Sequence, residues 1–228
     1  MIRHTSILIF AVCLTTGGCA SSGTKPHDMS VTQHEHAAQA EQDNAKTHAE
    51  QYDPGLEDTT EICGGGTVCW TTWSNPTAEH NQAANQHRTL AKKHRKAAEA
   101  LRKAEEAACQ GVDERDRDLS PFFHTSDIAR VDIPEAGSDA PIVITFKAVS
   151  GLSVDKLQTI LKCHIARSAA MGHEMPEMEY CPLVPRGVSA TASQAEEGLI
   201  VTISIDDGTE TRDEVLRRAD QLKQVVSS

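Results

Sequence analysis

The stretch IVITFKAVSGLSVDKLQTILKCHI, residues 142–165, decides the fold of this chain. Its first eight residues alternate in character and are rich in β-branched side chains, which predicts a strand over 142–149. Ser153 is a suitable N-cap, and the apolar residues after it recur at helical spacing as far as Ile165, which predicts a helix that ends near Gly172. A strand that leads directly into an amphipathic helix indicates a domain of mixed α and β structure.

The same domain continues through residue 228. Residues 188–194 and 199–205 predict a hairpin that turns at Glu196-Glu197-Gly198, and Thr211 with Glu214 forms a predicted capping box for a final helix. The order β-α-β-β-α over residues 141–228 predicts a small α+β sandwich, with two helices on one face of an antiparallel sheet. A further strand over 128–133 would bring the domain closer to a ferredoxin-like arrangement.

Residues 75–110 predict one long helix, which an acidic connector at 111–140 joins to the α+β domain. Asn75 suits the N-cap, Pro76 suits the first helical position, and Gly111 is a natural terminator. A single helix of this length would be about 52 Å long.

Three histidines, His80, His87 and His94, share one face of this predicted helix with several alanines. They lie seven residues apart, which is about 10.5 Å along the axis, and this spacing is too wide for two of them to ligate one metal ion. We interpret them as a polar stripe that contacts solvent or a neighbouring element. The alternative is a packing seam that responds to pH, because histidine titrates near neutrality.

The segments before the long helix are polar. Residues 62–74 contain three consecutive glycines between Cys63 and Cys69, followed by Trp70 and Trp73, and predict a tight loop. Residues 19–61 carry few large apolar side chains and many acidic ones, so that burial cannot offset the entropy of ordering them. We predict a disordered acidic tether there, with a reach of roughly 35 Å as a flexible coil.

Cys19 follows an N-terminal pattern that has a known meaning. Arg3 precedes a short apolar segment, which ends at Thr16-Gly17-Gly18-Cys19 and is too short to span a bilayer as a helix. This arrangement resembles the lipobox of bacterial lipoproteins, although Thr16 holds the place where these usually carry an aliphatic residue. The resemblance implies a signal peptide at 1–18 and lipidation of Cys19. Ala20 resembles the outer-membrane sorting pattern of Gram-negative bacteria, which implies a lipid-anchored protein that faces the periplasm.

Five cysteines remain beside Cys13 and the lipidated residue. The oxidising compartment implied by the signal favours disulfides, and two bridges among five cysteines allow fifteen pairings. Local spacing predicts Cys63–Cys69, where the glycines let the loop close, and Cys163–Cys181. Cys109 is then the odd thiol.

The loop at residues 173–181 holds the densest group of potential metal ligands. His173, Met175 and Met178 supply an imidazole and two thioethers, a donor set that suits copper(I). In the alternative interpretation the methionines fill gaps over the sheet and Cys181 is bridged to Cys163.

The net charge is −11, which disfavours nucleic-acid binding because phosphate contacts need clustered Lys and Arg. No phosphate loop, serine-nucleophile elbow or metalloprotease motif is present. We therefore predict a membrane-anchored lipoprotein with a non-enzymatic interaction or envelope-structural role, a protein partner and no cofactor. The alternatives are a periplasmic copper-handling protein that uses the 173–178 loop, and a redox protein that uses Cys163 and Cys181.

Overall fold

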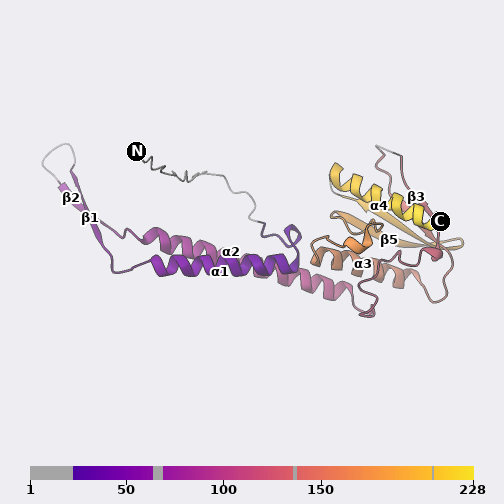
Figure 1. Cartoon of the computed structure of the whole chain (residues 1–228), viewed down its shortest axis with the longest axis horizontal. Helices are drawn as coiled ribbons and strands as arrows, with labels where there is room; N and C mark the ends of the chain where they lie inside the picture. Colours follow the sequence, from indigo (N-terminus) through magenta and orange to yellow (C-terminus); the bar gives the residue numbers. More distant parts are fainter. Residues whose placement is uncertain (1–22, 64–68, 136–137, 207) are drawn as a thin grey trace, which may run out of the picture.

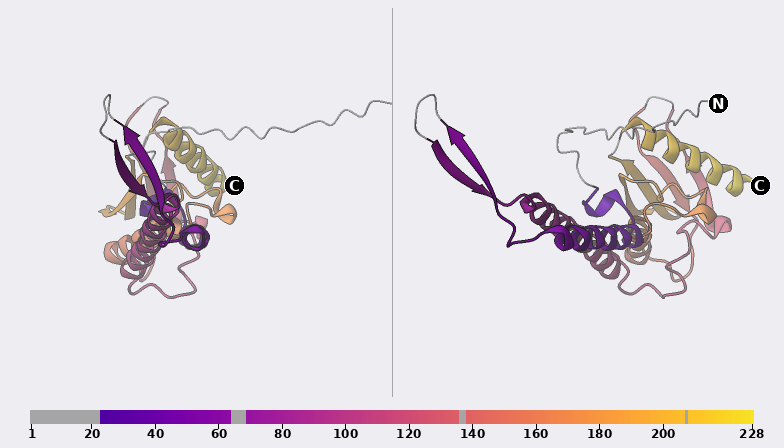
Figure 2. Two further views of the ribbon diagram at one scale, coloured as in Figure 1. Left: turned by 90° about the vertical axis from the view of Figure 1, so that its left-hand side faces the viewer. Right: turned by 60° about the vertical axis from the view of Figure 1, so that its left-hand side comes forward.

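The computed structural model describes residues 23–63, 69–135, 138–206 and 208–228. The molecule is elongated, with an α+β domain at one end, a pair of long helices in the middle and a two-stranded ribbon at the far end (Figure 1). The right-hand view of Figure 2 shows the ribbon standing clear of the domain. The predicted signal peptide and Cys19 lie outside the described residues.

Two antiparallel helices, α1 (Val31–Gln51) and α2 (Ala78–Ala108), lie side by side and form a helical hairpin. At the start of α1, the Ser30 hydroxyl accepts a hydrogen bond from the Gln33 N–H (3.1 Å), and the Gln33 side chain accepts one from the Ser30 N–H (2.8 Å). This is a capping box. The apolar side chains buried along the hairpin are mostly small: Ala38, Ala45, Ala84, Ala91, Ala97, Ala98 and Leu101.

The predicted disordered tether over residues 19–61 is wrong for most of its described length. Residues 31–51 are helical and residues 58–63 form a strand. A polar, alanine-rich segment is only marginally helical alone, but packing of its alanine stripe along α2 supplies the missing stability. Local composition does not reveal this contact, because the partner helix comes after the ribbon in the sequence. Among the helices of the described ranges, none is long and apolar enough to cross a bilayer.

The ribbon consists of β1 (Asp58–Cys63) and β2 (Cys69–Ser74), which pair antiparallel over six residues each. The disulfide Cys63–Cys69 is confirmed, and it joins the last residue pair of the ribbon, with a Cα–Cα distance of 4.1 Å. The predicted loop over 62–74 is therefore wrong at both ends, because residues 62–63 belong to β1 and residues 69–74 form β2.

The predicted long helix is present, but it begins at Ala78, two residues after Pro76, the predicted first helical residue. The Asn75 side chain accepts a hydrogen bond from the Thr77 N–H at 2.7 Å, and α2 starts only at Ala78. Asn75 and Pro76 therefore form the turn that precedes the helix rather than its cap and first residue.

In its described residues, the α+β domain contains one four-stranded antiparallel sheet in the order β3-β4-β6-β5 and two α-helices. The elements are β3 (Ile128–Asp132), β4 (Ile142–Phe146), α3 (Val154–Ala170), β5 (Val188–Ala195), β6 (Gly198–Ile205) and α4 (Thr209–Ser227). Buried residues alternate along β4 and β6 and share one core with both helices. The two helices therefore cover one face of the sheet, as predicted, and the α+β fold class is confirmed.

The connectivity differs from a ferredoxin-like domain. β3 and β4 are paired with each other, and the described residues that connect them contain no helix. Gly198 opens β6 at the predicted hairpin turn, with φ of 116°, and a Cβ there would overlap the carbonyl oxygen of Phe146. The predicted capping box of Thr211 and Glu214 is wrong, because α4 begins at Thr209 with Gly208 as its N-cap. The Glu214 side chain instead pairs with Arg217 and Arg218 on its own helix.

A disulfide between Cys109 and Cys163 joins the end of α2 to α3. The predicted bridge Cys163–Cys181 is wrong, and Cys181 is a free, buried thiol. Sequence proximity favoured Cys181, whereas α2 packs against α3 in space and brings a cysteine 54 residues distant to Cys163.

Polar contacts also fix the helical hairpin to the domain. Arg167 on α3 pairs with Glu105 of α2 (2.7 Å) and with Asp118 (2.6 Å). Arg186 donates to the backbone oxygen of Asp28 (3.2 Å), in the short turn before α1. The described chain therefore starts at the junction of hairpin and domain, and α1 leads away from it toward the ribbon.

Candidate functional site

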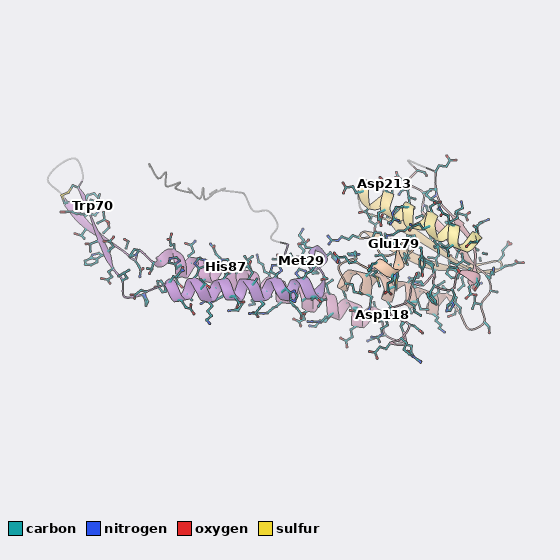
Figure 3. The ribbon with its side chains drawn as sticks, viewed as in Figure 1. Met29, Trp70, His87, Asp118, Glu179 and Asp213 are labelled. Carbon is teal, nitrogen blue, oxygen red and sulfur yellow. A yellow bond between two sulfur atoms is a disulfide. The ribbon has the colours of Figure 1, made fainter. Side chains whose placement is uncertain are left out.

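The ribbon places both tryptophans of the chain in solvent at the far end of the molecule. Trp70 is 51% exposed and Trp73 is 69% exposed, and the sequence contains no other tryptophan. Figure 3 shows Trp70 on the ribbon, remote from the α+β domain. An isolated two-stranded hairpin is only marginally stable in water, and here a disulfide closes it. Exposed indoles on a covalently closed strand pair indicate a contact surface.

Each face of the ribbon carries one indole and one carboxylate. Successive strand residues point to opposite faces, and residues directly opposite each other share a face. The register pairs Asp58 with Ser74 and Glu61 with Thr71. Asp58 therefore shares a face with Trp70, and Glu61 shares the other face with Trp73.

The charge around the ribbon has one sign. Residues 47–87, which include the ribbon and the adjoining turns of both helices, contain no Lys or Arg. The same range contains six acidic residues: Glu50, Asp53, Glu57, Asp58, Glu61 and Glu79. The distal end of the molecule is therefore an acidic, aromatic surface.

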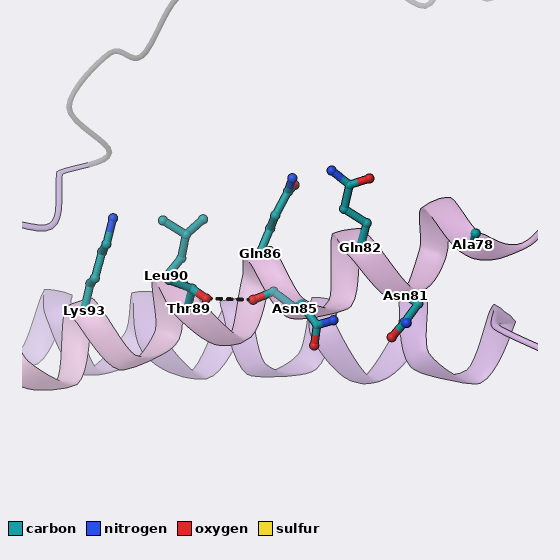
Figure 4. A pocket seen from close by; sticks show the side chains of 8 residues that line it. All are labelled: Ala78, Asn81, Gln82, Asn85, Gln86, Thr89, Leu90 and Lys93. Carbon is teal, nitrogen blue, oxygen red and sulfur yellow. Dashed lines mark hydrogen bonds between the residues drawn. The ribbon is translucent and has the colours of Figure 1, made fainter. Parts of the chain in front are cut away.

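Beside the ribbon, one side of α2 forms a shallow open groove of about 760 Å³ (Figure 4). Its lining is mainly amide and hydroxyl side chains: Ala78, Asn81, Gln82, Asn85, Gln86, Thr89, Leu90 and Lys93. The Thr89 hydroxyl donates to the Asn85 backbone oxygen at 2.8 Å. This lining offers hydrogen bonds but neither a nucleophile nor an acid–base pair, so it suits contact rather than chemistry.

Three pairs of polar side chains cross the seam between α1 and α2 at seven-residue intervals. They are His34–His94, Glu41–His87 and His48–His80. From one pair to the next, the residue number rises by seven on α1 and falls by seven on α2, so the three pairs follow one antiparallel register. The predicted stripe of His80, His87 and His94 thus contacts a neighbouring helix, which is one of the two environments that the sequence allowed.

The pair nearest the domain is almost completely buried. Nδ1 of His34 lies 3.1 Å from Nδ1 of His94, and Nε2 of His34 lies 3.1 and 3.2 Å from the backbone oxygens of Lys25 and Pro26. Because Nε2 faces two acceptors, it carries the hydrogen, and Nδ1 of neutral His34 accepts from His94. Burial lowers the pKa of His94, and the neighbouring His34 lowers it further.

The two outer pairs are half-buried. Nδ1 of His87 lies 2.5 Å from the Glu41 carboxylate, and Nδ1 of His48 lies 3.2 Å from Nδ1 of His80. The His48 ring also stacks on the His87 ring, with centroids 5.4 Å apart. The outer seam is therefore one continuous polar contact across the two helices.

The geometry of the histidine pairs is that of hydrogen bonds rather than of metal ligands. The ring centroids are 5.4 Å apart in His34–His94 and 5.5 Å apart in His48–His80. These distances exceed the Nδ1···Nδ1 distances of the same pairs, 3.1 and 3.2 Å, by about two ring radii. The nitrogens thus point at each other and not at a common third point. Within the described ranges, one group of three His, Cys, Asp or Glu donors lies within reach of a single ion, Glu61 with Cys63 and Cys69, and the disulfide occupies both sulfurs.

The predicted copper ligands are positioned by packing of the α+β domain. Met175 and Met178 are buried in its hydrophobic core, where thioethers fill irregular gaps. His173 has φ of 64°, and its Nδ1 donates to the Val184 backbone oxygen at 2.8 Å. Burial lowers the pKa of His173. This arrangement favours the alternative in which the methionines of the loop cover the sheet.

Cys181 and His164 form a buried thiol–imidazole pair, with Sγ 3.3 Å from Nε2. Burial raises the pKa of Cys181 to about 11 and lowers the pKa of His164 to about 4. Both shifts favour the neutral forms, so the thiol donates a hydrogen bond to the imidazole. Catalytic and redox-active cysteines instead have depressed pKa values that stabilise the thiolate, a feature that this pair lacks.

The sequence reasoning missed the two seam histidines of α1, His34 and His48. Two signals could have found them. Ser30 and Gln33 have capping-box spacing, which marks a helix start. His34 and His48 are fourteen residues apart, which is twice the interval between the histidines of α2.

Comparisons of the chain with protein-family models, with curated proteins and with solved structures found no match.

Proposed function

We propose that this chain is a lipoprotein of the Gram-negative outer membrane that faces the periplasm and has a non-enzymatic interaction role. In this proposal Cys19 carries the lipid, the helical hairpin projects the ribbon away from the anchor, and the ribbon contacts a partner protein. The observation that carries the proposal is the exposure of Trp70 and Trp73 on a disulfide-closed ribbon at the end of the hairpin.

The position of the anchor supports this division of roles. Four residues carry the chain from Cys19 to Gly23, and covalent geometry limits that reach to roughly 14 Å. The lipid would therefore sit close to the junction of hairpin and domain. From there α1, with its 21 residues, extends about 31 Å toward the ribbon. A rigid helix, rather than the predicted flexible coil, thus serves as the spacer.

A non-enzymatic role agrees with the state of the reactive side chains. The thiol of Cys181 and the imidazole of His164 are buried and favour their neutral forms. The remaining cysteines of the described ranges are paired in disulfides. The groove beside the ribbon is lined mainly by amides and hydroxyls.

Membrane fractionation of a Cys19→Ser variant tests the anchor. We expect the wild-type chain in the membrane fraction with acyl chains on Cys19 by mass spectrometry, and the variant in the soluble fraction. Cys13→Ser is the matched control, because that cysteine lies in the predicted signal peptide, and it should fractionate as wild type. If the Cys19→Ser chain remained with the membrane, the proposal would be wrong.

A further inference from the structure

We propose that the ribbon binds an extended basic segment of a partner protein, which adds to β1 as a third strand and carries two Lys or Arg side chains three residues apart. This inference rests on the proposed function, because it names the class of partner that the same ribbon contacts.

The outer edge of β1 is available for strand addition. β1 pairs with β2 along one edge, and its other edge has no strand beside it in the part of the chain that the structure describes. All six β1 residues are exposed. An unpaired strand edge recruits an extended peptide through main-chain hydrogen bonds. The Cys63–Cys69 disulfide keeps the ribbon formed before binding, which lowers the entropic cost of forming the complex.

The positions of the carboxylates define the basic residues of the partner. Asp58 and Glu61 are three residues apart on β1 and therefore lie on opposite faces of the ribbon. A strand paired with β1 presents two residues opposite them, which are also three apart and also on opposite faces. Lys or Arg at both positions would meet one carboxylate on each face, and opposite charges across paired strands are favourable.

The indoles strengthen the preference for a cation on both faces. Trp70 shares a face with Asp58, and Trp73 shares the other face with Glu61. The register places Trp73 two residue pairs from Glu61, and Trp70 four pairs, about 13 Å along the strands, from Asp58. The indoles therefore offer separate cation-attracting surfaces to further basic residues of the segment, through the aromatic quadrupole, rather than to the two that meet the carboxylates. Each face of the ribbon thus combines a carboxylate with a cation-binding ring.

The charge of the distal end disfavours the other occupants. Residues 47–87 contain six acidic residues and no Lys or Arg, so nucleic acid and anionic lipid are repelled. A second copy of the same ribbon is repelled for the same reason. The basic residues of α2 begin at Arg88, ten residues and about 15 Å along the helix from its start at Ala78, and salt screens their influence over about 8 Å.

Titration with synthetic peptides tests the inference. The probe is a ten-residue peptide of alternating Thr and Val with two Lys three residues apart, and its isomer has the Lys two residues apart, on one face. Both are added to the full chain in a non-ionic detergent. The emission of Trp70 and Trp73 reports on the ribbon alone, because the chain has no other tryptophan. We expect saturable blue-shifted emission with the first peptide, several-fold weaker binding of the isomer, and weaker binding at high salt.

Variants locate the binding on β1. Glu61→Gln and Asp58→Asn should each weaken the affinity for the first peptide by about threefold, and the double variant should weaken it by about tenfold. Glu210→Gln, which removes an exposed carboxylate of α4, should bind as wild type. Circular dichroism and non-reducing mass mapping verify that each variant keeps its fold and the ribbon disulfide.

Four results of these experiments would contradict the inference. No emission change, equal binding of both peptides, or full binding by the double variant would overturn the inference. Binding of anionic vesicles in place of the peptide would also overturn it. Release of the Cys19→Ser chain from membranes is measured separately. If the peptide titration failed but this release occurred, the basic-strand inference would be wrong and the proposal of an anchored lipoprotein would stand.

Discussion

Nδ1 of His34 lies 3.1 Å from Nδ1 of His94 across the buried seam of the helical hairpin, and only one hydrogen fits between these two nitrogens. Nε2 of His34 is already committed to two backbone oxygens. Full protonation of both rings would therefore direct two N–H groups at each other in a buried site. Because this pair is the most deeply buried of the three polar pairs that cross the seam, such protonation would weaken the packing of α1 on α2.

The stability of the chain should fall as the pH is lowered from 7.5 to 5.5. Burial, with His34, lowers the pKa of His94 below its ordinary value of 6.5. In the window just below pH 6.5 the unfolded chain binds more protons than the folded chain, so stability rises with pH there and is lost on acidification. Glu41 and Asp28 act in the opposite sense on His94 and reduce the effect. Urea unfolding followed by circular dichroism at several pH values measures the slope.

The control for this pH dependence is an exposed histidine on the same helix. His94→Gln should reduce the slope of stability against pH, whereas His36→Gln, at an exposed position of α1, should leave it unchanged. His164, with a pKa of about 4, contributes in the same direction and remains in both variants. Equal slopes for His94→Gln and the wild type would show that the seam pair is not responsible.

The Cys181 thiol should resist alkylation in the native protein. It is fully buried, its pKa is raised to about 11, and the thiolate is the reactive form. Iodoacetamide at pH 8, with peptide mass mapping, should label Cys181 slowly in the native state and rapidly in urea. Fast native labelling would indicate an accessible, activated thiol and would reopen the redox interpretation.

The α+β domain could be predicted from the sequence because its signals are local. Alternation over 142–146 and helical spacing from Ser153 onward are each contained in one element. The partner of Cys163 could not be found in this way, because Cys109 approaches it only once α2 packs against α3. The helix α1 was missed for the same reason, since its stability depends on a partner beyond the ribbon.

The candidate site was predicted only in part. The residues of the ribbon were recognised as unusual, and the Cys63–Cys69 disulfide followed from the glycines between the two cysteines. That residues 58–63 and 69–74 pair as strands could not be read from composition, because an exposed two-stranded ribbon has no buried face to impose alternation. The exposure of Trp70 and Trp73 is therefore information that only the structure supplies.

Gly198→Ala should destabilise the domain by roughly 3 kcal/mol, because it combines backbone strain with overpacking. The residue has φ of 116°, and a Cβ would overlap the carbonyl oxygen of Phe146 on the paired strand β4. Gly208→Ala is the matched control, since its φ is −62° and a Cβ there meets no atom within 4 Å. Thermal unfolding should show a lower Tm for the first variant and a change of less than a few degrees for the second. Similar Tm values would mean that the turn relaxes around the added methyl group.

Removal of the Cys109–Cys163 disulfide should destabilise the whole chain more than removal of Cys63–Cys69. The first bridge spans 54 residues, for which the chain-entropy model gives about 4 kcal/mol, and it holds α2 to α3. The second spans six residues and stabilises the ribbon alone. We expect the double variant Cys109→Ser, Cys163→Ser to lower the urea midpoint of the main transition, and Cys63→Ser, Cys69→Ser to leave that midpoint unchanged. Double substitution leaves no unpaired thiol to exchange with Cys181. Equal midpoints for both variants would show that the Arg167 ion pairs and helix packing suffice to hold the hairpin on the domain.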